Sequence, residues 1–181
     1  MKNYPRIYSL STLGLIHHYE NDYLFHNMRT DFVGDSGSGK SIIADLLQLI
    51  FVGSEMFESA TRTMDEKREL DGLVLRTPHK GIDIGYAFLN IEIQSRHYIV
   101  IGCYLESNSK RTKPFIIQGS SDPKANLLPI GQPLQTKDFK REGNICPLDD
   151  LLSQMEEKGL FLSYWETVKP YHRILYTHDI L

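Results

Sequence analysis

The chain has little cysteine, little net charge and no long apolar run. Cys103 and Cys146 are too few and too far apart for a disulfide framework or a zinc ribbon, so we expect two reduced thiols. A net charge of −3 argues against a protein that wraps itself in nucleic acid. Because neither a signal peptide nor a membrane span is visible, we expect a cytoplasmic protein without membrane contact.

The remaining composition is that of an ordinary globular protein. Apolar residues make up 41% of the 181 residues and charged residues 24%. This length suffices for one domain with a core of its own, and we treat residues 1–181 as a single domain. Local basic clusters could still contact DNA, although we interpret each, taken alone, as solvated loop charge; they lie at 67–68, 79–80, 110–113 and 137–141.

One motif dominates the N-terminal third. The octapeptide Gly34–Ser41 matches the phosphate-binding pattern GxxxxGK[ST] in full. A phosphate site needs converging backbone N–H groups, a cation and a ligand for Mg²⁺, and this segment supplies all three. We expect Lys40 to reach the β- and γ-phosphates of ATP, and the Ser41 hydroxyl to coordinate Mg²⁺. The predicted nucleotide-binding residues are Gly34, Asp35, Ser36, Gly37, Ser38, Gly39, Lys40, Ser41 and Ile42.

The flanks of the motif predict a strand, a glycine-rich turn and a helix in that order. Residues 28–33 predict a short strand that enters the turn. Residues 41–51 place apolar side chains at helical spacing, with Gly53 as the stop. The N-terminus of this helix would direct its dipole at the phosphates. The alternative, a flexible Gly/Ser loop, does not account for these flanks.

Further strands predict an antiparallel layer. Residues 7–16 and 23–26 predict two strands before the loop, residues 85–93 and 97–105 a hairpin, and residues 114–118 a third strand beside it. Residues 54–80 are interpreted as a loop-rich insertion with a short strand at 70–75. Residues 120–143 are interpreted as an irregular connection with a short helix near 136–139.

Two helical segments are predicted near the C-terminus. Residues 147–159 begin with Pro and acidic residues and end with Lys-Gly, which are helix start and stop signals. Residues 164–176 follow as an amphipathic segment interrupted near Pro170. The predicted fold class is therefore α/β, with a mixed sheet around the loop helix, an antiparallel β layer and C-terminal helices.

The acidic half of a hydrolytic site is not visible in the sequence. Hydrolysis of ATP needs a carboxylate that polarises water and further positive charge for the transition state. The apolar runs at 88–92 and 99–102 do not end in an acidic pair, and Asp149–Asp150 lacks a preceding strand. The sequence thus contains one side of a catalytic site, and we assign no catalytic residue.

The first 55 residues resemble the N-terminal head segment of SMC-like and recombination-repair ABC-type ATPases, which are P-loop NTPases. The resemblance rests on Gly37–Ser41 and on the helical run to Phe51. It implies an N-terminal half whose coiled coil and C-terminal half lie outside this chain. The expected partner is that C-terminal half or a second protomer, in a homodimer that closes on ATP and Mg²⁺. DNA is a further expected partner, in repair, chromosome maintenance or defence against foreign DNA.

The sequence departs from the family pattern at several positions. Ser36 stands where the family usually has Asn, so one nucleotide contact is altered. A glutamine that senses the γ-phosphate is expected near the root of the coiled coil, whereas Gln118 comes early and is interpreted as a polar residue at a strand end. His17 and His18 occupy the region where relatives contact nucleotide from the end of the first strand, but we interpret them as surface histidines. Arg62 and Arg68, in the loop after the first helix, could approach DNA or nucleotide, but we interpret them as solvated charge.

Other functions remain as alternatives at this stage. A free-standing nucleotide or small-molecule kinase suits the chain length, but its loop usually follows the first strand directly, and no arginine-bearing lid is evident. A GTPase normally carries Asn-Lys-x-Asp, and the string at 136–138 lacks that spacing. A scaffold that retains the loop without catalysis predicts no nucleotide-dependent dimerisation.

Overall fold

Six strands of the chain form one sheet in a computed structural model. The structure describes residues 4–26, 29–59, 62–63, 66–67, 70–78, 81–119 and 127–181. Its strands and α-helices are β1 (Arg6–Leu15), β2 (His18–Leu24), α1 (Lys40–Val52), β3 (Arg62–Thr63), β4 (Glu66–Lys67), β5 (Ile84–Gln94), β6 (His97–Glu106), β7 (Lys113–Gln118), β8 (Lys140–Arg141), β9 (Asn144–Ile145), α2 (Leu148–Glu157), β10 (Phe161–Tyr164) and α3 (Val168–Thr177). Short 3₁₀ helices span Ser54–Met56, Leu70–Leu73 and Thr136–Phe139.

The sheet has the strand order β10-β7-β6-β5-β1-β2, and every neighbouring pair in it is antiparallel. The predicted α/β class, the antiparallel layer and the β5–β6 hairpin are therefore confirmed. The predicted mixed sheet is not found, because no parallel pair occurs among the described strands. β2 and β10 form the two edges, and β2 is the edge that borders the loop.

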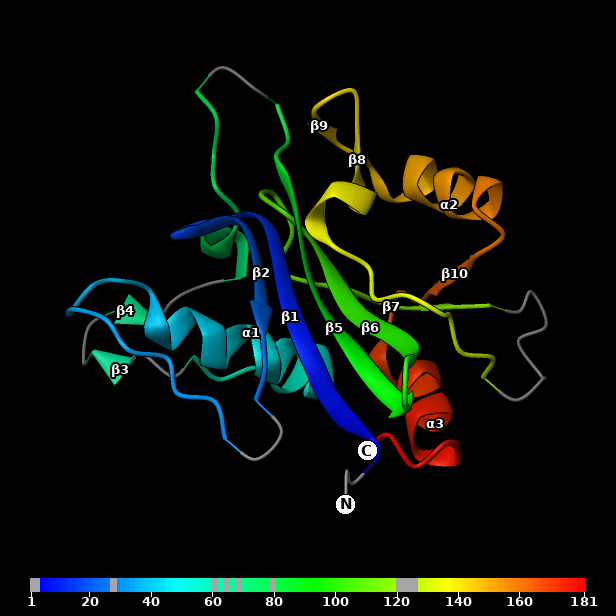
Figure 1. Ribbon diagram of the computed structural model, residues 1–181. Helices are drawn as coiled ribbons and strands as arrows, with labels where there is room; N and C mark the ends of the chain where they lie inside the picture. The colour runs from blue at the N-terminus through cyan, green and yellow to red at the C-terminus, as the bar shows by residue number, and fades with distance from the viewer. Residues whose placement is uncertain are drawn as a thin grey trace.

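Both faces of the sheet are covered (Figure 1). Residues of β5 alternate: Ala87 and Leu89 join the core beneath α1 and α3, and Tyr86 and Phe88 join the core beneath α2 and the segment 130–148. This alternation follows from the two-residue period of a strand. Since each face packs against a layer, β5 and β6 can be apolar along almost their whole length.

The C-terminal elements differ in part from their prediction. α2 is confirmed, whereas β10 was not predicted and pairs with β7, with Phe161 opposite Gln118. α3 runs through Pro170 without interruption. Pro170 is the third residue of α3, where the backbone N–H has no partner within the helix, so the missing donor costs no hydrogen bond.

The predicted strand at residues 28–33 is absent from the described part of that range. Residues 29–35 have no regular secondary structure, and residue 28 lies outside the described residues. The predicted strand at 70–75 is instead a 3₁₀ helix at Leu70–Leu73, followed by an isolated bridge between Val74 and Leu15. In the described parts of the chain, no helix has the length and apolar character needed to cross a membrane.

Candidate phosphate-binding loop

The predicted loop lies between the segment 29–33 and the first turn of α1. Residues 34–38 are exposed, while Gly39 is buried and stands at the N-cap of α1. The helix behind it is anchored in the core by fully buried residues, among them Ile42, Leu46 and Leu49. The loop is therefore carried on a rigid helix, with its backbone open to solvent.

Two glycines give the loop its shape. Gly37 and Gly39 have φ of 85° and 86°, in the left-handed region that glycine adopts without steric cost. A Cβ added to Gly39 would lie 2.7 Å from His18 Nε2 and 2.8 Å from the Cβ of His17, whereas one added to Gly37 would have no neighbour within 4 Å. Gly39 is thus required both for its dihedral angle and for close contact with the β1–β2 turn.

Lys40 is folded over the loop. Its Nζ donates hydrogen bonds to the carbonyl oxygens of Gly34 at 2.5 Å and of Asp35 at 2.6 Å, and contacts Ser38 Oγ at 3.3 Å. A further hydrogen bond joins Ser38 N to Asp35 O at 3.2 Å. The ammonium group therefore closes the loop on itself and stays exposed, so that an anion can approach it.

The arrangement around Ser41 fits a Mg²⁺ ligand. Ser41 is half-buried in the first turn of α1, and its hydroxyl makes no hydrogen bond to another described residue. Hydroxyl oxygens suit Mg²⁺, which keeps several waters and takes further ligands from phosphates. Within the described ranges, no group of three or more His, Cys, Asp or Glu side chains could hold a metal ion by itself. A Mg²⁺ ion at this loop would depend on Ser41 together with nucleotide.

A buried histidine that the sequence interpretation placed on the surface supports the loop. His17 is exposed at the β1–β2 turn, as expected, but His18 is only 7% exposed. His18 Nε2 lies 2.9 Å from Gly39 O, and its Nδ1 lies 2.7 Å from the Tyr23 hydroxyl. No local sequence pattern marks His18 for this role, because its partner is twenty-one residues away.

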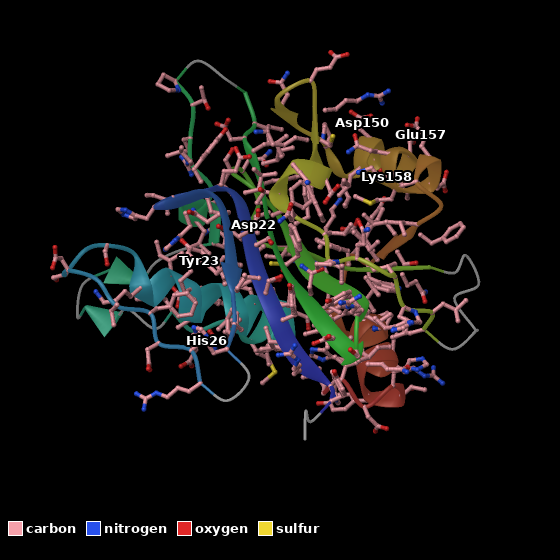
Figure 2. The ribbon with its side chains drawn as sticks, viewed as in Figure 1. Asp22, Tyr23, His26, Asp150, Glu157 and Lys158 are labelled. Atoms are coloured by element: carbon pink, nitrogen blue, oxygen red, sulfur yellow. The ribbon has the colours of Figure 1, made fainter. Side chains whose placement is uncertain are left out.

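Tyr23 extends this contact to the other end of the loop. Its ring meets Phe32 edge to face at 5.6 Å between centroids, and Phe32 also meets Phe25 at 5.8 Å. Figure 2 shows Tyr23 projecting from β2, with its neighbour Asp22 on the other face of the strand. Asp22 accepts hydrogen bonds from Thr136 N and Oγ1, at 3.1 and 3.0 Å. β2 thus connects the loop on one face of the sheet with the layer formed by α2 and residues 130–148, the α2 layer, on the other.

Other candidate residues lie away from the loop. Gln118 ends β7, where its Oε1 accepts a hydrogen bond from Leu128 N at 3.2 Å. Three strands separate β7 from β2 in the sheet. At about 4.8 Å between neighbouring strands, Gln118 is on the order of 19 Å from the strand that borders the loop. Arg68 lies outside the described residues, and the side chain of Arg62 is likewise not described.

Two further features near the sheet, the carboxylate of Glu92 and a hollow, are separate from the loop. Glu92, the acidic residue closest to the end of β5, forms an ion pair with Arg6 and accepts a hydrogen bond from Arg96 N. A hollow of about 640 Å³ is lined by residues of the 130–138 segment together with Lys158 and Leu160. It belongs to the α2 layer, whose Glu157 and Lys158 lie across the molecule from the loop in Figure 2.

A scan against protein-family models found no matching family, and a search of curated proteins found no similar protein. Functional interpretation of the loop therefore rests on its residues and their geometry.

Proposed function

We propose that the chain is the ATP- and Mg²⁺-binding N-terminal half of an SMC-like ATPase head. The observation that carries the proposal is the loop itself. An exposed turn with two left-handed glycines leads into the N-terminus of a core helix, and a lysine ammonium lies over the turn. Such a turn directs N–H groups and the positive end of the helix dipole toward one side, which is the requirement for binding phosphate.

Different loop residues would have different roles in binding the nucleotide. Lys40 would exchange its carbonyl contacts for the phosphate oxygens, a charge-assisted interaction stronger than the one it leaves. Ser41 would hold Mg²⁺, which neutralises charge on the phosphates when bound. Asp35, Ser36 and Ser38 are exposed at the rim, where their side chains would limit how deeply a nucleotide enters.

Two features of the chain favour a partner. The segment 29–35 contacts β2 through Phe32 and Tyr23, yet no described strand pairs with it. Val33 in this segment is 90% exposed. Unpaired backbone beside an exposed β-branched residue is suited to pairing with a strand of another segment. The C-terminal half of the same head, or a second protomer, would supply that strand together with the missing acidic residues.

Dimerisation on nucleotide and action on DNA belong to the same proposal. A second protomer would close over the γ-phosphate, and the closed dimer would contact DNA in repair, chromosome maintenance or defence. Lysine and arginine contacts to DNA phosphates release counterions, so affinity for DNA should fall steeply as salt rises. An affinity of the complete protein for DNA that does not change with salt would contradict this part.

The test is a titration of the chain with MgATP. We expect the wild type to bind MgATP weakly but saturably. Lys40→Ala should lower the affinity about ten- to a hundred-fold, because a hydrogen bond to a charged group contributes about 1.5–3 kcal/mol. Lys169→Ala is the matched control, since Lys169 is an exposed lysine in the first turn of α3. Ser41→Ala should weaken MgATP binding more than binding of ATP without metal.

Hydrolysis distinguishes a half site from a complete enzyme. We expect negligible ATP turnover by the isolated chain, because neither the apolar run at 88–92 nor that at 99–102 ends in the acidic pair that would polarise water. Turnover without a partner that disappears in Lys40→Ala would refute the half-head proposal. Phosphate transfer to a nucleoside or small molecule in a screen would favour the alternative of a free-standing kinase.

A further inference from the structure

Two side chains of β2 contact the phosphate-binding loop, one at each of its ends. At the exit, His18 Nε2 lies 2.9 Å from Gly39 O; at the entry, the Tyr23 ring packs against Phe32 at 5.6 Å. His18 and Tyr23 are themselves joined, with 2.7 Å between Nδ1 and the hydroxyl oxygen. The contacts therefore form a continuous chain of residues from Phe32 through β2 to Gly39.

The chemistry of these contacts determines the tautomer of His18. The Gly39 carbonyl can only accept a hydrogen bond, so Nε2 of His18 must carry the proton. In a neutral imidazole ring, Nδ1 then accepts the hydrogen bond of the Tyr23 hydroxyl. Burial raises the pKa of Tyr23, which keeps this hydroxyl protonated and able to donate. Since His18 is almost fully buried, water competes little for either bond.

Backbone satisfaction alone does not explain the His18 contact. Gly39 O already accepts a hydrogen bond from Ile42 N at 2.9 Å, as the first bond of α1. The second bond therefore adds direction to the peptide between Gly39 and Lys40. Because a trans peptide is planar, holding the Gly39 carbonyl toward His18 points the Lys40 N–H away from His18.

We propose that His18 is a positioning residue of the phosphate loop, which fixes the Gly39–Lys40 peptide for nucleotide, while Tyr23 holds the His18 ring through Nδ1 and links it to the loop entry. The inference rests on the proposed nucleotide site. It adds that the site depends on the β1–β2 hairpin, a segment outside the phosphate-binding pattern. The left-handed Gly39 makes this possible, since any Cβ there would lie only 2.7 Å from the imidazole nitrogen.

The experiment compares four variants of the whole chain in MgATP titrations. His18→Phe keeps an aromatic ring but removes both nitrogens, and we expect affinity to fall about five- to tenfold, the loss of one shielded hydrogen bond. His18→Gln retains an N–H donor of similar reach and should bind within about threefold of the wild type. Tyr23→Phe should lose about two- to threefold, because the ring packing remains. His97→Phe is the matched control at the exposed turn between β5 and β6.

Two readouts separate positioning from general stability. Thermal unfolding without nucleotide reports whether His18→Phe destabilises the fold as a whole. Nitrogen-15 NMR of the imidazole rings should show His18 protonated at Nε2 alone, with its Nε2 resonance shifted by MgATP.

The outcomes identify which inference fails. If the wild type binds MgATP and His18→Phe binds equally well, the positioning role is wrong and the nucleotide site stands. Equal losses in His18→Phe and His18→Gln would also overturn it, because the donor would then be irrelevant. If the wild type and Lys40→Ala both fail to bind MgATP at millimolar concentration, the proposed function and the positioning role fail together.

Discussion

Substitution of the two left-handed glycines by alanine should separate conformational strain from steric overlap. Gly37 and Gly39 have φ of 85° and 86°, so alanine at either position pays a similar conformational cost, about 1–2 kcal/mol. Only at Gly39 would the new methyl group meet other atoms, His18 Nε2 at 2.7 Å and His17 Cβ at 2.8 Å. Overpacking of this kind costs about 1–3 kcal/mol more.

We therefore expect Gly37→Ala to lower the free energy of unfolding by about 1–2 kcal/mol and Gly39→Ala by about 2–5 kcal/mol. The overlap at Gly39 is difficult to relieve. The Cβ of His17 is attached directly to the backbone, and His18 is held by Tyr23. Gly39 also caps α1, whose buried face contributes to the main core, so that a shift there propagates into packed residues.

Urea unfolding followed by circular dichroism measures both variants under identical conditions. Equal destabilisation by the two substitutions would refute the contact between Gly39 and the β1–β2 turn. A second check is the double variant Gly39→Ala with His18→Ala. Removing the imidazole relieves one of the two overlaps, so the double variant should be more stable than the sum of single effects predicts, by at least about 0.5 kcal/mol.

Three further predictions concern the sheet and its connections. Asn90→Ala should lower the free energy of unfolding by about 2–4 kcal/mol in the same assay. The reason is that the buried Asn90 side chain forms hydrogen bonds of 2.8 Å with both the N–H and the carbonyl of Leu134. An unchanged stability would contradict this role. Glu142→Asn should raise the free energy of unfolding by about 0.5 kcal/mol. Glu142 and Gly143 have φ of 51° and 81° in the β8–β9 turn, and asparagine adopts such left-handed dihedral angles more readily than glutamate. Thermal unfolding of the variant tests this expectation. Burial raises the pKa of Cys103 from 9.0 to about 12, so the thiol ionises at lower pH in the unfolded chain than in the folded one. The contribution of this thiol to the free energy of unfolding is therefore complete below pH 9 and is lost as pH rises toward 12. In Cys103→Ala, the free energy of unfolding should fall less steeply over this alkaline range.

The sequence predicted those elements whose signals are local. The β5–β6 hairpin follows from two long apolar runs around a short polar turn, and α2 from the proline and acidic residues at its start. The loop and its helix are located by the motif and by the spacing of apolar residues behind Lys40. In each case the residues that determine the element lie within a few positions of one another.

Elements that depend on distant partners were not predicted. β10 has only four residues, Phe161–Tyr164, and forms because β7 offers an edge more than forty residues earlier. His18 is polar and begins an edge strand, which is typical of a surface residue. Its burial depends on the approach of Gly39, which only the folded chain reveals. The loop and its helix could be located from sequence, but not the side chains that support the loop.

The strand expected before the loop is informative because it did not form. The apolar pair Phe32 and Val33 has the β propensity on which that expectation rested. One half of a strand's environment is present, since Phe32 packs against Tyr23 and Phe25. The other half is missing from the described residues, because Val33 remains exposed and no strand bonds to the backbone of residues 29–35. A strand is stabilised by its ladder as well as by its side chains, so a sequence can carry strand propensity for a neighbour supplied in trans. The half-head proposal predicts such a neighbour beside residues 29–35.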